Sequence, residues 1–328
     1  MAEQSHEAVY DTIIVGGGVS GLAAGVYCGR FRMKTLIIGD APGGVLALAG
    51  DVENYPGFEK ISGLDLALKI RDHALKHEGV EARDGKVTKI QKCGEGCFKV
   101  QKGDEHFHTK TIIFATGTEW RKLGVPGEQE YSSKGVHYCA LCDAPLYRDK
   151  IIAIAGGSDG AAKEALIASE HAKQIYVIMR GGELRAEPIN TQRVLANKKI
   201  VLIPNNEVAE IKGEKFVNKL ILKNDYNGSK ELAADGIFVS IGHIPLTSLA
   251  KEVGVKTNER DEIIIDQDGN TNIPGFFAAG DVCSRRFKQA ITGVGEGVTA
   301  AYSAYHYIGE NNLICIIDDS EADMQKKQ

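Results

Sequence analysis

A stretch near the N-terminus, YDTIIVGGGVSGLAAGVYCGRFRMKTLIIGD at residues 10–40, limits the possible folds more than any other feature of the chain. An apolar run leads into glycines, a helical segment follows, and a second apolar run ends near residue 38, which predicts a β-α-β unit. Gly16, Gly18 and Gly21 fit the spacing G-x-G-x-x-G. In this spacing the first glycine permits a tight turn, the second lets a pyrophosphate approach the backbone, and the third lets helix pack on strand. Asp40 lies near the position of a ribose-binding acid, and a plain turn residue is an equal alternative there.

A second strand, glycine turn, helix and strand follow at residues 150–180, KIIAIAGGSDGAAKEALIASEHAKQIYVIMR. The glycine pattern is incomplete here, because Gly156 and Gly157 are followed by Ser158 at the place of the second motif glycine. A chain of 328 residues is long enough for two domains. The sequence therefore predicts an α/β protein with two Rossmann-like three-layer nucleotide-binding domains.

Short alternating segments, punctuated by glycine and charge, accompany both units. They predict small antiparallel β-meanders, one of which precedes a parallel strand at residues 111–115 and the other of which begins near residue 205. Cys93 and Cys97 flank a Gly-Glu-Gly turn in the first meander. These cysteines could form a cross-strand disulfide or belong to a zinc site. The favoured interpretation is that they are incidental residues of the turn.

Composition and charge exclude several classes of protein. The net charge of −5 and the pI near 6.0 provide no broad basic surface, which predicts no nucleic-acid partner. No apolar run reaches the roughly 18 residues of a membrane span, and the N-terminus lacks the pattern of a signal peptide. Seven cysteines, an odd number in a long chain, do not suit a secreted disulfide framework. We expect a cytoplasmic protein whose polar tail, residues 318–328, is disordered.

The segment YCALCD, residues 138–143, holds the two thiols whose spacing carries chemistry. Cys139 and Cys142 form a C-x-x-C pair, which can close into a disulfide and in which the pKa of one thiol can fall from about 8.5 toward about 7 or below. Such a dithiol suits two-electron exchange. A structural zinc half-site is the alternative, but the chain has no second C-x-x-C or C-x-x-H. The pair is therefore predicted to be redox-active and to bind no metal.

Residues 271–308 combine a predicted strand that ends in Gly280 and Asp281 with an apolar helix that begins at about Gln289. A carboxylate at that strand end can accept hydrogen bonds from a polyol chain, and the helix N-terminus places partial positive charge beside a group that gains electrons. A turn or capping role is the alternative for Asp281.

Over nearly its whole length the chain resembles the low-molecular-weight thioredoxin reductases, flavoenzymes of the pyridine nucleotide-disulfide oxidoreductase superfamily. Eight segments in the same order carry the resemblance. They are the first glycine motif, VENYPG at residues 52–57, ATG at 115–117, CALCD at 139–143, the incomplete second glycine motif, IGHIP at 241–245, and AAGD with KQAITGVGEG at 278–281 and 288–297.

The resemblance implies a discontinuous FAD-binding domain at residues 1–118 and 248–328, and an inserted NAD(P)H-type domain at residues 119–247 that carries the dithiol. It implies a homodimer in which domain rotation presents the dithiol alternately to the flavin and to a partner protein. In similar enzymes Cys142 meets the flavin, Cys139 attacks the disulfide of thioredoxin or a thioredoxin-like protein, and Asp143 gives and takes the proton.

Position by position, the resemblance also assigns cofactor ligands. Those for FAD are Gly16, Gly18, Gly21, Asp40, Asn54, Gly117, Gly280, Asp281, Lys288, Gln289 and Ala290, and those for the nicotinamide cofactor are Gly156, Gly157, Arg180 and Arg185. Lys288 replaces an Arg of the family, and Val45 stands where a Gln is common.

Two departures concern the partner and the electron donor. Pro145 and Leu146 replace aromatic residues that dock thioredoxin in the family. Met179, Arg180 and Gly181 replace the family's HRR, whose arginines grip the 2′-phosphate of NADPH. We therefore expect poor discrimination between NADPH and NADH, with reduced ferredoxin or a reduced deazaflavin as alternative donors.

The presence of the Cys139–Cys142 dithiol argues against most alternative functions of a flavin-binding protein. A related ferredoxin or quinone reductase lacks it, a flavin-binding sensor has no need of it, and the glutathione reductase type carries its cysteines four residues apart in the first domain. A flavin-dependent dithiol oxidase shares every motif and stays open as an alternative.

Overall fold

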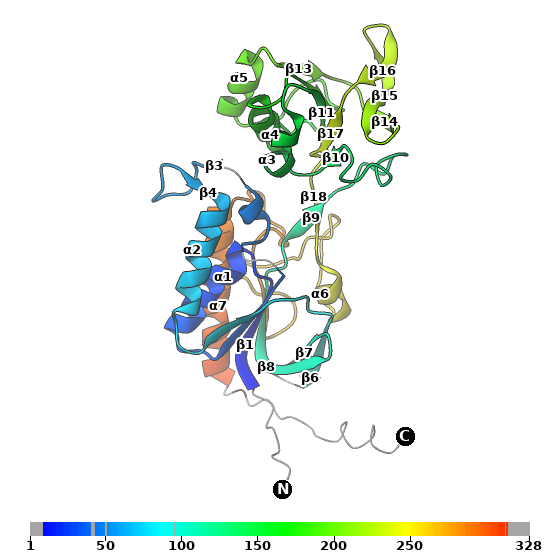
Figure 1. Ribbon diagram of the computed structural model, residues 1–328. Helices are drawn as coiled ribbons and strands as arrows, with labels where there is room; N and C mark the ends of the chain where they lie inside the picture. The colour runs from blue at the N-terminus through cyan, green and yellow to red at the C-terminus, as the bar shows by residue number, and fades with distance from the viewer. Residues whose placement is uncertain (1–8, 41–42, 50, 95, 312, 314–328) are drawn as a thin grey trace, which may run out of the picture. The chain divides into compact units, whose positions relative to one another are not determined.

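The computed structural model describes residues 9–40, 43–49, 51–94, 96–311 and 313, and the tail expected to be disordered lies outside them (Figure 1). The chain divides into two compact units, Met1–Thr118 with Pro245–Gln328, and Glu119–Ile244. We call these the first and the second unit. No helix among the described residues is long and apolar enough to cross a membrane.

The first unit is built on one mixed sheet with the strand order β5-β2-β1-β8-β7-β6, and β19 pairs with β8 outside this path. The pairs among β5, β2, β1, β8 and β19 are parallel, whereas β6, β7 and β8 are joined by antiparallel pairs. The strands of this sheet are β1 (Val9–Val15), β2 (Thr35–Ile38), β5 (Val80–Arg83), β6 (Lys89–Gly94), β7 (Cys97–Lys102), β8 (Glu105–Phe114) and β19 (Phe276–Ala278).

Strand β1 is buried on both faces, because its residues alternate between two apolar cores. Ile13 and Val15 belong to the core that β6, β7 and the short helix α6 (Ser248–Glu252) help to close. Ile14 belongs to the core beneath three helices, α1 (Val19–Arg30), α2 (Gly63–Leu75) and α7 (Ala290–Asn311). Figure 1 shows these helices side by side on one face of the sheet.

Strand β8 differs from the expectation of a meander followed by a separate parallel strand. It is one continuous strand, whose N-terminal half pairs with β7 while its C-terminal half pairs with β19. On its other edge it pairs with β1 from His108 to Phe114. The backbone of β8 offers the same hydrogen-bonding groups to β7 and to β19. The residues of β8 therefore do not indicate where one neighbouring strand replaces the other.

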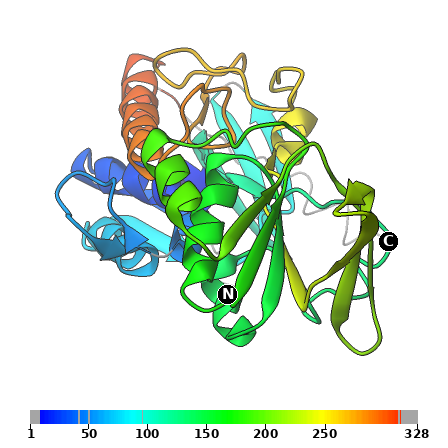
Figure 2. The same ribbon diagram turned by 90° about the horizontal axis from the view of Figure 1, so that it is seen from above.

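The second unit has a parallel five-stranded sheet of order β10-β17-β11-β12-β13 and an antiparallel three-stranded sheet β14-β15-β16. Seen from above, the helices of this unit (green) lie on one side of the parallel sheet and the antiparallel strands (olive) on the other (Figure 2). The strands are β10 (Val136–His137), β11 (Ile151–Ala155), β12 (Gln174–Ile178), β13 (Ile200–Ile203), β14 (Val208–Gly213), β15 (Val217–Tyr226), β16 (Ser229–Ala233) and β17 (Gly236–Val239). The helices are α3 (Ala140–Asp143), α4 (Asp159–Ser169) and α5 (Pro188–Ala196), with a 3-10 turn η2 (Ala144–Tyr147).

The two segments that connect the units pair with each other. Strand β9 (Thr118–Trp120) and strand β18 (His243–Pro245) form a two-stranded sheet of their own. Leu246 N–H donates to Gly117 O at 3.0 Å on the side of the first unit, and Arg121 N–H donates to Gly242 O at 2.9 Å on the side of the second. The remaining small elements are η1 (Gly44–Leu48) and the strands β3 (Asp51–Val52) and β4 (Ile61–Ser62).

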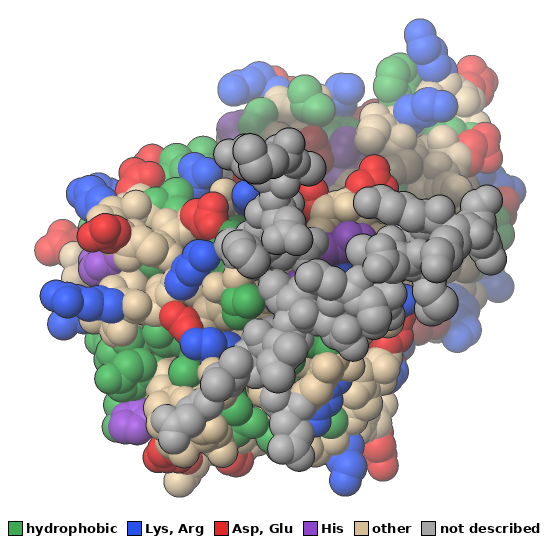
Figure 3. Space-filling view, turned by 90° about the horizontal axis from the view of Figure 1, so that it is seen from below, with side chains coloured by type: hydrophobic (Ala, Val, Ile, Leu, Met, Phe, Trp, Pro, Cys, Tyr) green, Lys and Arg blue, Asp and Glu red, His purple; other side chains and the backbone are tan. Residues whose placement is uncertain are grey.

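Basic and acidic side chains are mixed on the surface, as the absence of a basic stretch in the sequence predicts. On the face seen from below, Lys and Arg side chains lie among Asp and Glu side chains, without a continuous basic area on its visible part (Figure 3). Exposed pairs such as Lys102 with Glu105, 2.6 Å apart, add little stability individually.

Candidate active site

The turn between β1 and α1 is shaped by glycine. Gly16 has φ +122°, and a side chain there would overlap the carbonyl oxygen of Ala115. A side chain on Gly21 would overlap the carbonyl oxygen of Gly16, whereas one on Gly18 would meet nothing within 4 Å. Gly16 and Gly21 are therefore needed for packing, and Gly18 leaves its side of the turn open to a ligand.

The N-terminus of α1 is prepared for an anion. Its N-cap residue, Gly18, provides no side-chain cap, and no acidic residue stands in the first turn. The first N–H groups of a helix have no intrahelical acceptor, so here they can donate to the phosphates of a dinucleotide. Asp40 is exposed at the end of β2, with its carboxylate 3.4 Å from Lys86 Nζ.

Two predicted FAD ligands that are far apart in sequence contact each other. Asn54 Nδ2 donates to Gln289 Oε1 at 3.0 Å across a separation of 235 residues. This bond joins the VENYPG loop to the start of α7, where Ala290 is the first helical residue. Both residues belong to the first unit, as expected for ligands of one cofactor.

The loop between β19 and α7 is held by two buried or half-buried charges. Gly280 has φ +82°, and its N–H donates to Glu296 Oε2 at 2.8 Å. Lys288 Nζ donates to Asp281 O at 2.9 Å and lies 2.5 Å from Glu262 Oε1. Lys288 thus orients the backbone at Asp281 and leaves the Asp281 carboxylate available to a ligand.

These features fit FAD. The open side of Gly18, the uncapped start of α1 and the unobstructed Gly117, which has φ +67° and nothing within 4 Å of an added Cβ, form one cradle that side chains would fill. Val45 is 42% exposed in η1, and no contact of the structure assigns it a role.

The second glycine turn also depends on glycine for its packing. Gly156 has φ +154°, and a side chain there would overlap Ser240 O, while a Cβ on Gly157 would lie 2.9 Å from Met179 Cβ. Ser158 is the N-cap residue of α4 but makes no side-chain cap. Asp159 in the first turn accepts from Glu187 N–H and is paired with Lys163 Nζ, at 2.9 and 2.8 Å.

The two arginines predicted to bind the nucleotide differ in their anchorage. Arg185 is fixed by its backbone, because its N–H donates to Gly157 O at 2.8 Å. The side chain of Arg180 is 79% exposed, and its Nε lies 3.8 Å from Glu207 Oε1. Such an exposed pair is weak, so Arg180 can turn toward a phosphate at small cost. Gly181, between them, has no side chain that could donate to a phosphate.

The dithiol is closed in this structure. Cys139 and Cys142 form a disulfide with a Cα–Cα distance of 5.4 Å at the start of α3. Cys139 is the N-cap residue of this helix, and its Sγ accepts from Cys142 N–H at 3.2 Å. A sulfur at a helix N-terminus is stabilised as a thiolate once the disulfide opens. Cys142 is exposed and Cys139 is half-buried.

Asp143, which the resemblance predicts to transfer the proton, is held by a histidine that the sequence analysis did not single out. His137 Nδ1 lies 2.9 Å from Asp143 Oδ2, and His137 Nε2 lies 2.8 Å from the hydroxyl of Tyr147. The imidazole is 7% exposed and stacks on Phe238, with ring centroids 5.3 Å apart. Burial raises the pKa of Tyr147 to about 12. Because a carboxylate only accepts, the tautomer of His137 with hydrogen on Nδ1 is the one that can donate to Asp143 and accept the Tyr147 O–H at Nε2.

The other described thiols outside the meander are buried. Cys28 and Cys283 are free and buried, and burial raises the pKa of Cys28 to about 12. A buried thiol that stays protonated is a poor nucleophile.

Comparisons with known proteins identify the family of this chain. The pyridine nucleotide-disulphide oxidoreductase family matches residues 10–297. The thioredoxin reductase of Listeria innocua is 37% identical over 309 residues, which cover 93% of this chain and 96% of the relative. The solved thioredoxin reductase of Lactococcus lactis is 39% identical, with a TM-score of 0.88 over 92% of this chain and 99% of that chain. A ferredoxin-flavin thioredoxin reductase from Clostridium acetobutylicum is 30% identical, with a TM-score of 0.50 over 92% and 99%.

The closed C-x-x-C pair, together with relatives that are thioredoxin reductases, identifies the protein class as flavin-dependent disulfide reductase. Such an enzyme is an oxidoreductase whose cofactor is FAD. The chain belongs to the pyridine nucleotide-disulphide oxidoreductase family. The predicted fold class, family resemblance, enzyme class and flavin cofactor are thereby confirmed.

Proposed function

We propose that this enzyme reduces the disulfide of thioredoxin or of a thioredoxin-like protein through Cys139 and Cys142. The observation that carries the proposal is the closed disulfide at the start of α3, with Asp143 beside it and oriented by His137. The names of the relatives from Listeria innocua and Lactococcus lactis support thioredoxin as the partner. In this proposal the first unit binds FAD, and the second binds the nicotinamide cofactor.

Cys139, Cys142 and Asp143 each take part in a different step of the proposed reaction. FAD, when bound, supplies the two electrons that open the Cys139–Cys142 disulfide. The Cys139 thiolate attacks one sulfur of the partner's disulfide, forming a mixed disulfide and releasing the partner's second sulfur as a thiolate. The Cys142 thiolate then attacks Cys139 Sγ, which closes the enzyme disulfide and releases the partner as a dithiol. Asp143 supplies a proton to the leaving thiolate.

The partner meets an apolar border around the dithiol. Leu141, 38% exposed, lies on α3 beside Cys142, and Leu146, 68% exposed, lies on the 3-10 turn η2 that follows. Pro145 is exposed between them. Aliphatic side chains in place of aromatic ones offer a smaller and more adaptable contact, which suits a partner with a flat apolar rim around its own cysteines.

The electron donor is the least constrained part of the proposal. Gly181 removes a guanidinium from the place where the 2′-phosphate of NADPH binds in similar enzymes, and Arg180 and Arg185 are the remaining cations there. We propose a nicotinamide cofactor bound with little discrimination between NADPH and NADH. Reduced ferredoxin is the second candidate, favoured by the similarity to the ferredoxin-flavin enzyme of Clostridium acetobutylicum. A reduced deazaflavin is a further candidate donor.

We also propose a homodimer in the cytoplasm. The first unit carries Tyr302 and Tyr305 on α7, 53% and 44% exposed, in contact with Phe31. Exposed aromatic side chains that are grouped in this way are typical of subunit interfaces. The molecular mass in solution tests this part separately from the activity.

One experiment tests the central assignment. The enzyme loaded with FAD is reduced anaerobically and mixed with oxidised thioredoxin, and free thiols of the partner are counted. We expect Cys139→Ser to abolish turnover while FAD content stays that of the wild type. Turnover of any protein disulfide by this variant contradicts the role of Cys139. Rapid oxygen consumption with a small dithiol, in the absence of a protein partner, favours a dithiol oxidase instead.

A further inference from the structure

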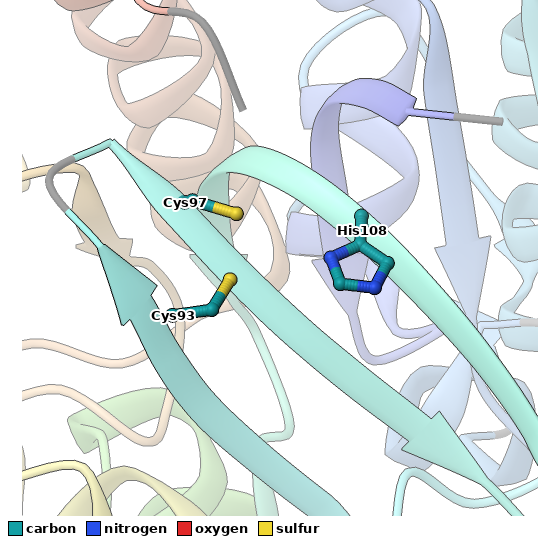
Figure 4. A group of neighbouring side chains, drawn as sticks. All are labelled: Cys93, Cys97 and His108. Carbon is teal, nitrogen blue, oxygen red and sulfur yellow. The ribbon is translucent and has the colours of Figure 1, made fainter. Parts of the chain in front are cut away.

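The side chains of Cys93 on β6, Cys97 on β7 and His108 on β8 gather over three neighbouring strands that the proposed reaction does not use (Figure 4). Cys93 is a free thiol, so the two cysteines do not form a cross-strand disulfide with each other in this structure. Cys97 is disulfide-bonded, so its sulfur is not available to a metal ion. A different pair, Glu128 with Tyr138, adjoins the redox dithiol.

The residue before the first redox cysteine is anchored by a buried carboxylate. The Tyr138 hydroxyl donates to Glu128 Oε1 at 2.7 Å. Glu128 is 5% exposed, and it also accepts from Leu123 N–H at 2.8 Å and from Gly124 N–H at 2.6 Å. Both oxygens of this carboxylate therefore have partners, as the burial of such a group requires.

The chemistry of the two groups fixes the direction of the bond between them. Burial, together with the hydrogen bond to Glu128, raises the pKa of Tyr138, so the hydroxyl keeps its proton and acts as the donor. Gly124 has φ +73°, and successive backbone N–H groups in such a turn form a concavity that binds anions. The carboxylate of Glu128 is thus held by the backbone on one side and holds Tyr138 on the other.

The backbone that binds Glu128 belongs to the segment by which the chain enters the second unit. Leu123 and Gly124 follow Trp120, the last residue of β9, by three and four residues. The Trp120 ring also contacts the ring of Tyr138, with centroids 6.4 Å apart and an interplanar angle of 33°. Tyr138 is therefore attached to this segment twice, through its hydroxyl and through its ring.

The two residues before Cys139 are anchored on opposite faces of the parallel sheet, as alternation along an extended chain predicts. Tyr138 packs against the core that contains Tyr131 and the residues of β14 and β15. His137 stacks on Phe238, which belongs to the other core of the second unit. The backbone that leads into Cys139 is thereby fixed from both sides, whereas Cys142 lies exposed on the single turn of α3.

We propose that Tyr138, held by Glu128, is a positioning residue for the redox disulfide, because it fixes Cys139 beside Cys142 and so favours closure of the bond. This inference deepens the proposed function and rests on the part that Cys139 and Cys142 take in it. A sulfur that is already held in place loses less entropy when the disulfide closes. Closure removes two electrons and two protons from the dithiol, and glutathione disulfide can accept them and become two molecules of glutathione.

The test is the thiol-disulfide equilibrium of the full-length flavoprotein. The protein is equilibrated under argon in mixtures of reduced and oxidised glutathione, free thiols are alkylated, and the state of Cys139 and Cys142 is read by peptide mass. Tyr138→Phe removes the hydroxyl but leaves the ring and both backbone bonds of Glu128, so the variant should fold. We expect its equilibrium constant for closure to fall about tenfold, the usual size of the loss of one hydrogen bond to a carboxylate. This shift corresponds to a potential about 30 mV more positive for two electrons.

Tyr131→Phe is the matched control, because it removes another buried tyrosine hydroxyl from the same core. Tyr131 is 6% exposed, and its hydroxyl donates to Gly213 O at 2.8 Å. We expect this variant to lower the Tm about as much as Tyr138→Phe and to leave the equilibrium constant within about twofold of the wild type.

Two results would overturn the inference. One is an unchanged equilibrium constant in Tyr138→Phe, and the other is an equal shift in Tyr131→Phe, which would show that any loosening of this core acts on the dithiol. The measurement uses no thioredoxin, so it decides the inference whichever protein is the partner. Failure of the wild type to reduce thioredoxin contradicts the proposed function and leaves this equilibrium unaffected.

Discussion

His137 Nδ1 lies 2.9 Å from Asp143 Oδ2, which places a buried imidazole directly behind the carboxylate next to the redox disulfide. The contact holds Asp143 in one orientation, and Tyr147 fixes the far side of the ring at 2.8 Å. A proton donor that is held in place loses less entropy in the transition state than a mobile one. The strength of this contact should therefore appear in the rate of turnover and not in partner binding.

The first prediction concerns this pair. His137→Phe keeps the stacking on Phe238 but removes both hydrogen bonds, so Asp143 loses its orientation. We expect kcat to fall about tenfold with the KM for the protein partner unchanged, and Asp143→Asn to cost about a hundredfold, in the range of general acid catalysis. Tyr147→Phe, which leaves the His137 contact to Asp143 intact, is the matched control and should cost less than about threefold. A His137→Phe enzyme as fast as the wild type would show that the imidazole only fills space.

The second prediction separates the roles of the two sulfurs. In Cys139→Ser, the Cys142 thiol cannot close a disulfide and should lie as a thiolate beside oxidised flavin. We expect a long-wavelength absorption shoulder that weakens as the pH is lowered through the thiol pKa, because protonation removes the electron donor. Absorption spectra between pH 5 and pH 9 measure it. If the shoulder belongs to Cys142→Ser instead, the two roles are reversed.

The third prediction concerns the missing arginine. Gly181 has ordinary space around it, with Glu183 O 3.8 Å from an added Cβ, so Gly181→Arg should fold. A charge-assisted bond to phosphate is worth about 1.5 to 3 kcal/mol, which corresponds to roughly ten- to a hundredfold in affinity. We expect the preference for NADPH over NADH to rise by about that factor, measured as anaerobic flavin bleaching at equal concentrations.

Gly182→Arg is the matched control for this change, because it adds the same charge one residue later. It should leave the NADPH to NADH ratio within about threefold of the wild type. Rapid bleaching of the wild type by micromolar NADPH, without bleaching by NADH, would mean that Arg180 and Arg185 already suffice.

The sequence predicts the sheets and turns of this protein well, because their signals are local. The apolar run before the first glycines predicts a strand, which is β1, and the helix predicted from about Gln289 is α7, which begins at Ala290. Apolar periodicity and the steric demand of Gly16 act within a few residues of the chain. The continuous strand β8 was divided in the prediction because the change from β7 to β19 depends on which neighbours arrive, not on its own residues.

Contacts between polar side chains could not be predicted from the sequence either, because they depend on which elements the fold brings together. His137 lies on β10 and Asp143 ends α3, six residues later and beyond the dithiol, and no periodicity predicts that their atoms meet. His108 joins Cys93 and Cys97 only through the register of β7 and β8. The family resemblance predicts that Asn54 and Gln289 bind FAD, but it does not predict the hydrogen bond between them, which is seen only in the folded first unit.

The fourth prediction concerns partner docking. Leu146 is 68% exposed on the turn after the dithiol, and a charge there would have to be desolvated when an apolar partner surface covers it. Leu146→Asp should raise the KM for the protein partner at least about tenfold and leave the reduction of a small aromatic disulfide unchanged. Leu195→Asp, equally exposed at 68% on α5, is the control and should change neither rate. Equal effects of the two changes would show that net charge, and not the docking position, is responsible.

The last prediction concerns stability and pH. Burial raises the pKa of Glu164, on α4, to about 8, and its buried Oε2 has no hydrogen-bond partner among the described residues. The unfolded chain loses this proton near pH 4.3, whereas the folded protein keeps it up to about pH 8. Between these values the folded state binds the extra proton, so the free energy of unfolding decreases as the pH rises.

The full effect is limited to about 1.4 kcal/mol per pH unit. Because the side chain keeps some solvent contact, we expect about half of the limit, roughly 2 kcal/mol between pH 5 and pH 8. Glu164→Gln should remove this slope and raise the Tm at pH 8 by several degrees, while differing little from the wild type at pH 5. Glu170→Gln, an exposed change at the end of the same helix, is the control. Thermal unfolding of the flavoprotein at both pH values measures the difference, and parallel Tm curves for the wild type and Glu164→Gln would show that the carboxyl group is ionised in the folded protein at both pH values.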